Sequence, residues 1–320
     1  MKVSVVVPMF NEARHIGRTL QSVRKAAEAA GFDCELIVAD NGSSDDGPQI
    51  ARSLGAQVLS LPGLTIGALR NHGTRASSGE WLAFLDADIE VPEHWLDMLM
   101  ALHVQGHGDV FALDCDTPRQ APWFARAWQR RALSGTQAEH RVQWLPTPNL
   151  LMQRRWFDQV GGFSETLRTG EDKDFTLRLS QAGARLLAVR SPVAWHWGFE
   201  GSWREWLGKE LWRQSSQLQL LRSNGASLRL LRLPMLSVAA WLLDIFAVSA
   251  ILDDAEPLGV FLLFVSSLPA LALSLRQSLR HRDPLFTLQL WGLHWIRLHL
   301  AGAAFIFSLF NWNARRPARG

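Results

Sequence analysis

Trp81-Leu-Ala-Phe-Leu-Asp86-Ala-Asp88 is an apolar, strand-like run that ends abruptly in two carboxylates one residue apart. Side chains at positions i and i+2 of an extended segment point the same way, so both carboxylates could bind one divalent cation. Carboxylate oxygens suit Mg²⁺ or Mn²⁺. A solvated acidic turn is the alternative, and this pair alone does not decide between the two.

Short apolar runs alternate with helical patterns on both sides of this stretch. The expected strands cover residues 3–7, 35–39, 57–61 and 81–85, and the expected helices cover residues 11–30, a short segment after residue 46, residues 64–77 and a segment from residue 92. This alternation predicts a parallel, doubly wound α/β sheet. Because ligands bind beyond the carboxyl ends of such strands, residues 8–12, 40–46 and 86–88 should share one crevice.

The pattern changes after residue 108. Residues 109–148 are less regular and could form a separate lobe. Beyond them we expect strands at residues 149–152 and 186–189 and helices at residues 155–160 and 172–181.

Composition divides the chain into parts. Charged and turn residues separate short apolar runs up to about residue 200, whereas long apolar stretches dominate after Pro234. We therefore expect a first domain at residues 1–200, a linker with an amphipathic helix at residues 201–233 and a membrane region at residues 234–320. The net charge of +3 suits anionic lipid surfaces or phosphorylated ligands, and no nucleic-acid-binding motif occurs.

The cysteines and the start of the chain bear on the compartment. Cys34 and Cys115 lie far apart inside apolar runs without metal-ligand spacing, so we expect buried thiols in a reducing compartment. The apolar start of the chain turns polar at Asn11 and Glu12, which makes it too short and too β-branched for a signal peptide. The first domain is therefore expected in the cytoplasm.

Three stretches come close to the roughly 20 apolar residues that cross a bilayer core. Residues 235–252 contain one charged residue, Asp244, residues 258–275 contain none, and residues 286–310 hold His294, Arg297 and His299. We expect the first two to form a hairpin and the third to be interfacial or re-entrant. A buried helical subdomain of a soluble protein is the alternative. Asp244 would be costly in a span unless it faced protein or water, which makes it a candidate lipid-site residue.

The orientation of the hairpin follows from basic residues at its ends. Arginines precede residue 235 and follow residue 275, whereas the link at residues 253–257 has no basic residue. The positive-inside rule then places the soluble domain in the cytoplasm. An amphipathic helix at residues 202–222 could lie on the bilayer surface or pack on the soluble domain.

Five motifs occur in order at fitting intervals: Val3-Ser-Val-Val-Val-Pro-Met-Phe-Asn-Glu12, Val38-Ala-Asp-Asn-Gly-Ser-Ser-Asp-Asp-Gly47, Arg70-Asn-His-Gly73, Phe84-Leu-Asp-Ala-Asp88 and Gly170-Glu-Asp172. Together they resemble family 2 glycosyltransferases over roughly residues 1–200. The resemblance implies a GT-A fold with a doubly wound mixed sheet, a UDP-, GDP- or dTDP-linked sugar donor, Mg²⁺ or Mn²⁺, and inversion at the anomeric carbon. The apolar C-terminal region resembles that of bacterial inner-membrane enzymes that build envelope polysaccharides or sugar-linked lipids.

The resemblance also implies roles for residues of the donor side. Pro8, Glu12 and Asp40 would line the base and ribose pocket, with Asp40 accepting a hydrogen bond from a nucleobase. Arg70 would reach the diphosphate, and Asp86 would contact the ribose or a metal-bound water. From the residue patterns alone, a turn residue is the favoured interpretation of Asp40, and Arg70 could equally be an exposed helix arginine or a ligand contact.

The remaining assignments concern the metal and the acceptor. Asp88 would bind the metal directly, and His196 matches a histidine that completes the metal site in some relatives. Asp172 matches the catalytic base of the family, at a helix N-terminus where it could also act as a cap. Asn149, Glu171 and residues 157–163 would lie on the acceptor side. Trp197 and Trp203 could stack on a sugar or be structural.

One departure concerns processivity. Processive synthases of this family carry Gln-x-x-Arg-Trp before their membrane helices, and this chain reads Glu210-Leu-Trp-Arg-Gln-Ser there. We therefore expect transfer of a single sugar to a lipid-linked or polyprenyl-phosphate acceptor. The alternatives are a nucleotidyltransferase, which would release pyrophosphate, and a membrane scaffold that binds a sugar nucleotide without catalysis.

Overall fold

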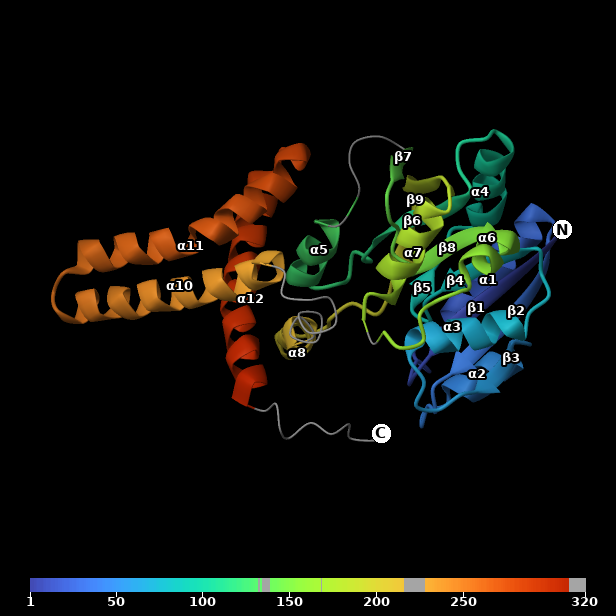
Figure 1. Ribbon diagram of the computed structural model, residues 1–320, viewed down its shortest axis with the longest axis horizontal. Coiled ribbons are helices and arrows are strands. Elements are labelled where there is room, and N and C mark those ends of the chain that lie inside the picture. The colour runs from blue at the N-terminus through green and yellow to red at the C-terminus, as the bar shows by residue number, and fades with distance from the viewer. Residues whose placement is uncertain (132, 134–138, 168, 216–227, 311–320) are drawn as a thin grey trace. The chain divides into compact units, whose positions relative to one another are not determined.

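The computed structural model describes residues 1–131, 133, 139–167, 169–215 and 228–310 (Figure 1). These described residues form one nine-stranded mixed sheet in the order β3-β2-β1-β4-β8-β6-β9-β5, with β7 paired to β9. The strands are β1 (Lys2–Met9), β2 (Asp33–Asp40), β3 (Gln57–Ser60), β4 (Trp81–Leu85), β5 (Ile89–Glu90), β6 (Val110–Asp116), β7 (Glu139–Val142), β8 (Asn149–Gln153) and β9 (Leu186–His196).

Strands β3, β2, β1 and β4 are parallel neighbours, and β8 runs antiparallel between β4 and β6. The prediction of a doubly wound sheet is therefore confirmed, and the sheet is mixed, as in the GT-A fold. The antiparallel strand β8 matters for function because it places β6 and β9 beside the carboxyl end of β4. Polar groups from both halves of the chain thus meet at one edge of the sheet.

Helices cover both faces of the sheet. They are α1 (Ile16–Ala30), α2 (Gly47–Ser53), α3 (Ile66–Arg75), α4 (Trp95–Val104), α6 (Arg154–Val160) and α7 (Glu171–Gln181). Successive residues of β1 point into different hydrophobic cores on the two faces of the sheet. Val5 belongs to the core with α1 and α4, and Val6 belongs to the core with α6 and α7. This alternation is the two-residue period of a strand with both faces buried.

The first helix is shorter than the predicted residues 11–30, because α1 starts at Ile16. The stretch before it is tied to the loop after β2. Asn11 has a positive φ of 55°, its Oδ1 accepts a hydrogen bond from the Ser44 N–H, and the Ala13 N–H donates to Asp45. These long-range hydrogen bonds compete with helix formation and shape the mouth of the crevice.

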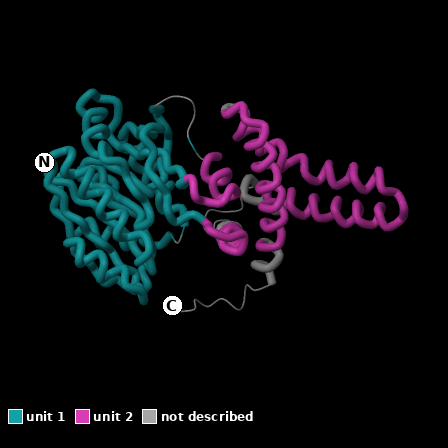
Figure 2. The backbone as a smooth tube through the Cα atoms, turned by 180° about the vertical axis from the view of Figure 1, so that it is seen from behind, with its two compact units in different colours: residues 1–118, 133–199, 320 teal, residues 119–132, 200–319 magenta. Residues whose placement is uncertain are grey.

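The chain divides into two compact units (Figure 2). The first contains residues 1–118 and 133–199, and the second contains residues 119–132 and 200–319. Helix α5 (Trp123–Arg130), which follows β6 in the chain, therefore belongs to the second unit. The irregular segment at residues 109–148 is thus shared: β6 and β7 join the sheet, whereas α5 joins the helices.

The second unit is helical where it is described. It contains α5, α8 (Trp203–Ser215), α10 (Leu228–Leu252), α11 (Glu256–Ser278), a short 3-10 helix (Leu279–His281) and α12 (Pro284–Phe310). Trp206 of α8 is fully buried, and the Trp128 Nε1–H of α5 donates to Glu210 of α8 at 3.1 Å. The expected amphipathic helix at residues 202–222 is therefore confirmed as far as Ser215. Residues 216–222 lie outside the described residues.

Helices α10 and α11 form a hairpin, and α12 runs across it (Figures 1 and 2). Within the described residues, the stretches Met235–Leu252 and Glu256–Ser278 are long and apolar enough to cross a membrane. Most of their large side chains are exposed. Two apolar helices that could be membrane spans thus follow the mixed sheet.

Asp244 has a protein partner inside the first of these stretches. Its Oδ2 lies 2.6 Å from Nε2 of His299 on α12, and the Nδ1 of His299 lies 2.8 Å from the Trp295 carbonyl oxygen. The sequence analysis expects Asp244 to face protein or water if this helix spans a membrane. The contact with His299 provides such a protein partner. The contact also fixes α12 against α10, where the Ser237 hydroxyl donates to the Leu298 carbonyl.

Candidate active site

A pocket of about 290 Å³ lies at the carboxyl ends of β1, β2 and β4. It is lined by Pro8, Met9, Phe10, Glu12, Asn41, Ile66, Leu69, Asp86, Ala87 and Asp88. Four residues that the sequence assigned to the donor or metal side (Pro8, Glu12, Asp86 and Asp88) therefore share this pocket. Phe10 is half exposed in it and was missed by the sequence reasoning. A single aromatic residue directly after a buried strand was the available signal.

Asp40 ends β2 beside this pocket and is almost completely buried. Its carboxylate accepts hydrogen bonds from the Ser43 N–H, at 3.2 Å from Oδ1, and from the Ser43 hydroxyl at 2.5 Å. This is the turn role that the residue pattern alone suggested. The role of Asp40 toward a nucleobase stays a prediction.

Asp86 and Asp88 do not continue the strand. β4 ends at Leu85, and the Ile89 N–H donates to the Asp86 carbonyl oxygen, so residues 86–89 form a turn. The extended geometry predicted for the two carboxylates is therefore wrong. In the turn, Asp86 contacts Arg70 and Asp88 contacts His196.

Arg70 of α3 connects two acidic residues from distant parts of the chain. Its Nη2 donates to Asp86 Oδ1 at 3.0 Å, and its Nη1 donates to Glu171 Oε1 at 2.9 Å. The Arg70 side chain is 2% exposed, so the alternative of an exposed helix arginine, which the sequence pattern left open, is wrong. Glu171 is also buried, and it reaches the sheet edge through this ion pair.

The environment of Asp86 changes its acidity. Burial raises the pKa of Asp86 to about 6, with the neighbouring Asp88 carboxylate acting in the same direction and the Arg70 guanidinium in the opposite one. The Arg70 guanidinium thus pairs with the carboxylates of both Asp86 and Glu171. Without this cation, two negative charges so close to the buried edge of the sheet would destabilise the fold.

Asp172 is the second residue of α7. The helix is capped by Gly170, which has a positive φ of 77° and makes no side-chain cap. The Asp172 Oδ1 accepts a hydrogen bond from the Lys173 N–H at 2.7 Å, and the side chain is partly exposed. Three acidic residues occupy the first turn of α7, where the helix dipole favours the ionised form of a carboxylate. Asp172 therefore presents a carboxylate next to the Arg70-bound Glu171.

Asp88 and His196 form a close pair. The Asp88 Oδ2 lies 3.1 Å from His196 Nε2, and the two side chains are 18% and 29% exposed. His196 is the last residue of β9, which extends well past the predicted residues 186–189. A Cβ atom at Gly198 would lie 1.8 Å from the Asp88 Oδ2, so only glycine allows this approach. Gly198 is a second site residue that the sequence reasoning missed.

The pair can be compared with what a divalent cation needs. In the described part of the chain no group of three or more His, Cys, Asp or Glu side chains is arranged to hold a metal. The Asp88 carboxylate and the His196 imidazole nitrogen could supply two ligands to a divalent cation, and Gly198 puts no side chain beside them. This arrangement fits an ion that completes its coordination shell with water and the phosphates of a ligand. Asp88 and His196 are the residues that would hold it.

Three residues that the sequence analysis placed on the acceptor side, Asn149, Phe157 and Phe163, are buried and pack within the protein. Asn149 is fully buried, and its side-chain amide bonds both backbone groups of Leu113 and the Cys115 sulfur. It therefore has no exposed surface for a ligand and shapes the irregular end of β6 instead. Phe157 and Phe163 belong to the core around Phe84.

Trp197 and Trp203, the candidate sugar-stacking residues, have partners within the protein, and both cysteines are free thiols. Trp203 stacks on Phe124 within the helical unit, with ring centroids 4.4 Å apart, and Trp197 bonds Glu90 through its indole N–H. Neither cysteine is in a disulfide, and burial raises the pKa of the Cys34 thiol to about 12.

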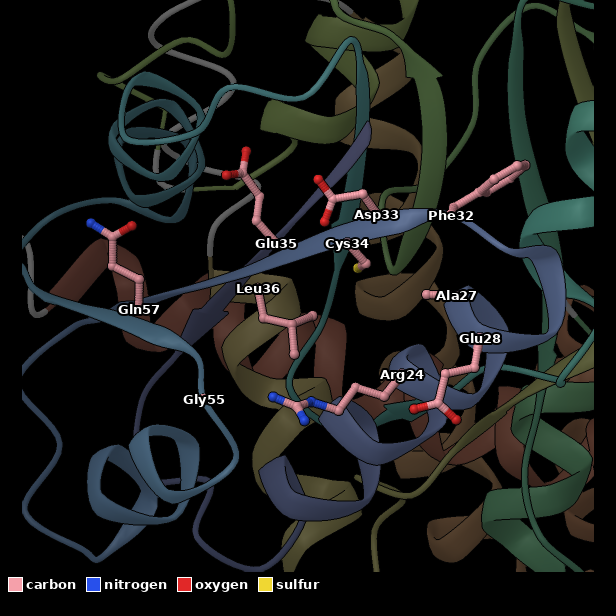
Figure 3. A pocket seen from close by; sticks show the side chains of 10 residues that line it. All are labelled: Arg24, Ala27, Glu28, Phe32, Asp33, Cys34, Glu35, Leu36, Gly55 and Gln57. Atoms are coloured by element: carbon pink, nitrogen blue, oxygen red, sulfur yellow. The ribbon is translucent and has the colours of Figure 1, made fainter. Parts of the chain in front are cut away.

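A further pocket of about 510 Å³ lies at the amino ends of β2 and β3, the opposite edge of the sheet (Figure 3). Arg24 and Glu28 of α1 and Asp33, Cys34 and Glu35 of β2 are among the residues that line it. It contains none of the residues that the motifs brought together. The pocket at the carboxyl ends is therefore the candidate active site.

Residues 4–175 match the family model described as glycosyl transferase family 2, and the chain belongs to this family. Among curated relatives, glycosyltransferase AglE of Haloferax volcanii is 29% identical over 204 residues, which are 61% of this chain and 66% of that protein. The undecaprenyl-phosphate 4-deoxy-4-formamido-L-arabinose transferase of Edwardsiella ictaluri is 30% identical over 139 residues, covering 40% of this chain and 41% of that protein. The chain thus spans less than two thirds of the length of these relatives.

A solved structure shares the fold. Mannosyltransferase PcManGT from Pyrobaculum calidifontis, in complex with GDP-Man and Mn²⁺, matches with a TM-score of 0.53 and 17% identity over 94% of this chain and 86% of that chain. The comparisons together show a member of glycosyl transferase family 2 with a GT-A fold.

Proposed function

We propose that this protein is an inverting, metal-dependent glycosyltransferase that moves one sugar from a nucleotide-sugar donor to a lipid-linked or polyprenyl-phosphate acceptor in envelope polysaccharide biosynthesis. The observation that carries the proposal is the chain of contacts at one sheet edge. It runs from the Asp88–His196 pair through the turn to Asp86, and through Arg70 to the helix that bears Asp172. A donor bound in the adjacent pocket would lie between the two ends of this chain.

The residues divide the chemistry between them. Asp88 and His196 would hold Mg²⁺ or Mn²⁺, which when bound neutralises charge that grows on the departing nucleoside diphosphate. Pro8, Glu12, Asp40 and Asp86 would bind and orient the nucleoside. Arg70 would support this side through Asp86, because its guanidinium is already bonded there.

Transfer then needs a base on the opposite side of the anomeric carbon. An acceptor hydroxyl oxygen would form the new bond to that carbon as the bond to the diphosphate oxygen breaks. Asp172 would take the hydroxyl proton, and the nucleoside diphosphate would leave with the bonding electron pair. Attack opposite the leaving group inverts the configuration. A polyprenyl-phosphate acceptor would arrive ionised and would not need this proton transfer.

Three observations support the donor, the acceptor and the location. PcManGT was solved with GDP-Man and Mn²⁺, and the Edwardsiella relative is named for an undecaprenyl-phosphate acceptor. The two apolar helices, α10 and α11, suit a hydrophobic lipid-linked acceptor and contact with membrane lipids. We place residues 1–200 as the catalytic domain at the cytoplasmic face of a bacterial inner membrane, residues 201–233 as linker and residues 234–320 as membrane region.

The test is a panel of radiolabelled UDP-, GDP- and dTDP-sugars incubated with the full chain and native membrane lipids. The proposal predicts label in the lipid fraction with one donor, release of nucleoside diphosphate, and loss of turnover in EDTA. Release of pyrophosphate would indicate a nucleotidyltransferase. Donor binding without product from any member of the panel would favour the non-catalytic scaffold, and turnover that survives EDTA would contradict the roles of Asp88 and His196.

A further inference from the structure

Three side chains next to the Asp88–His196 pair form a cluster of their own: Arg18 on α1, Glu90 on β5 and Trp197 just after β9. The Trp197 Nε1–H donates to Glu90 Oε2 at 2.6 Å. The Arg18 guanidinium lies over the Trp197 ring, with Cζ 3.4 Å from the ring centroid, and Arg18 Nε is 4.0 Å from Glu90 Oε2. We call these three residues the Trp197 cluster.

The Trp197 cluster fastens the segment that carries His196 onto the segment that carries Asp88. The backbone pairing there is short: β5 pairs with β9 only through Ile89 with His196 and Glu90 with Trp195. One further backbone hydrogen bond runs from the Trp197 N–H to the Asp88 carbonyl oxygen at 2.8 Å. The indole and the Glu90 carboxylate therefore supply side-chain support where the ladder ends.

Trp197 also stands between the two residues that touch the Asp88 carboxylate. His196 precedes it and lies 3.1 Å from Asp88 Oδ2, and Gly198 follows it with no room for a Cβ atom against the same oxygen. Any rotation of the backbone at Trp197 would therefore move both neighbours relative to Asp88. The indole ring, held by a hydrogen bond on its edge and a cation on its face, resists such a rotation.

We propose that Trp197, Glu90 and Arg18 are positioning residues that set the divalent-metal affinity of the Asp88–His196 pair. The proposal rests on the proposed function, because that function assigns the metal to the pair. Residues that orient metal ligands without touching the ion commonly change metal affinity by about 10- to 100-fold when they are replaced. Arg18 and Glu90 are 45% and 35% exposed, so loss of their contacts should cost little folding stability.

The experiment measures binding of Mn²⁺ alone to the detergent-solubilised full chain, by electron paramagnetic resonance of free Mn²⁺. The variants are Trp197→Phe, which keeps an aromatic ring at this position and removes the indole N–H, Glu90→Ala, which removes the acceptor, and the double variant. Trp195→Phe is the matched control, because Trp195 lies two residues away, is 37% exposed and has no hydrogen bond from its indole N–H in the described structure. Melting temperatures of all variants report whether the fold is intact.

We expect each single variant to weaken Mn²⁺ affinity by about tenfold, and the double variant to be no weaker than the weaker single one, because both remove the same contact. Trp195→Phe should match the wild type. Raising the Mn²⁺ concentration should restore turnover of Trp197→Phe, but not of Asp88→Asn. If Trp197→Phe failed to fold, Glu90→Ala would carry the test by itself.

Two results would overturn the proposal: Mn²⁺ affinities within twofold of the wild type in both single variants, or losses that multiply in the double variant. Asp88→Asn separates this failure from failure of the proposed function. If Asp88→Asn loses Mn²⁺ while the cluster variants keep it, only the positioning role is wrong. If Asp88→Asn binds Mn²⁺ as the wild type does, or the wild type binds none, the metal assignment falls and the positioning role falls with it.

Discussion

Asp86 and Asp88 are separated only by Ala87, yet their carboxylates have different partners. The turn that follows β4 sends Asp86 to the buried Arg70 and Asp88 to His196. The pKa of Asp86 is raised to about 6 by burial, an effect that no property of the acidic pair in the sequence could indicate. The surroundings of the two side chains, and not their residue type, therefore distinguish these two carboxylates.

The first prediction concerns Asp172. If it is the base, Asp172→Asn should lower the rate of nucleoside-diphosphate release by about 10²- to 10⁴-fold while donor affinity stays the same. Asp174→Asn is the matched control, because Asp174 lies on the same turn and is paired with Arg178 at 2.7 Å. Equal rates for the wild type and Asp172→Asn would refute the catalytic assignment.

The second prediction concerns pH and Glu35, at the far edge of the sheet (Figure 3). Although burial acts to raise it, hydrogen bonds from Ser4, Lys2 and two backbone N–H groups lower the pKa of Glu35 to about 2. A carboxylate with a depressed folded-state pKa stabilises the fold above its unfolded pKa, which is about 4.3, and this contribution disappears as the pH falls from there through about 2.

Glu35→Gln should therefore be less stable than the wild type at pH 7, by about 1–2 kcal/mol, and the gap should close as the pH falls below 4. Melting temperatures of the full chain across pH 7 to 3 measure this. Glu28→Gln is the control, since Glu28 lines the same pocket on the exposed side of α1. A gap that does not change with pH would show that Glu35 acts by packing alone.

Helix α3 is the element that joins the two halves of the candidate active site. A Cβ atom at Gly73 would lie 2.3 Å from a methyl group of Val6, so glycine lets α3 pack directly on β1. Arg70, one turn earlier, then reaches both Asp86 in the turn after β4 and Glu171 of α7. The sequence pattern predicted a helix at residues 64–77, and the structure shows it capped by Thr65, but its function as a bridge depends on two distant partners.

The third prediction tests this bridge. Arg70→Met should lower the free energy of unfolding by about 3–5 kcal/mol, because it leaves Glu171 buried without its cation. Arg75→Met, on the same helix, breaks an exposed ion pair with Glu165 and should cost less than about 1 kcal/mol. Both are measured by thermal unfolding of the full chain, and equal losses for the two variants would argue against a buried bridge.

The whole molecule combines a mixed sheet with a helical unit whose apolar hairpin is largely exposed. The link between α10 and α11 carries Asp253, Asp254 and then Glu256, with no basic residue, whereas arginines flank the other ends of the hairpin. If the hairpin spans a membrane, this charge distribution puts the link outside and the sheet inside. The helical unit also takes in α5, whose residues lie within the family match at residues 4–175.

The fourth prediction is topological. In intact cells, Asp254→Cys should react with a membrane-impermeant maleimide, whereas Glu28→Cys should react only after the membrane is permeabilised. The wild type, with its partly buried Cys34 and Cys115, gives the background. Labelling of Glu28→Cys in intact cells, or protection of Asp254→Cys, would contradict the proposed orientation.

Local sequence patterns are enough to predict the strand and helix order of the first half, the family, the apolar hairpin and the acidic residues to examine. These features depend on local periodicity and on motifs of a few residues, which a single chain displays directly. The match with residues 4–175 and the mixed sheet agree with them.

How those residues combine becomes visible in the folded chain. It paired Asp86 with Arg70 and Asp88 with His196, buried Arg70 against Glu171, took Asn149 into the end of β6 and moved α5 into the helical unit. The physical reason is distance along the chain: Arg70 and Glu171 are 101 residues apart, and Asp88 and His196 are 108 apart. Contacts of that range arise from packing of the whole sheet, which no local pattern encodes.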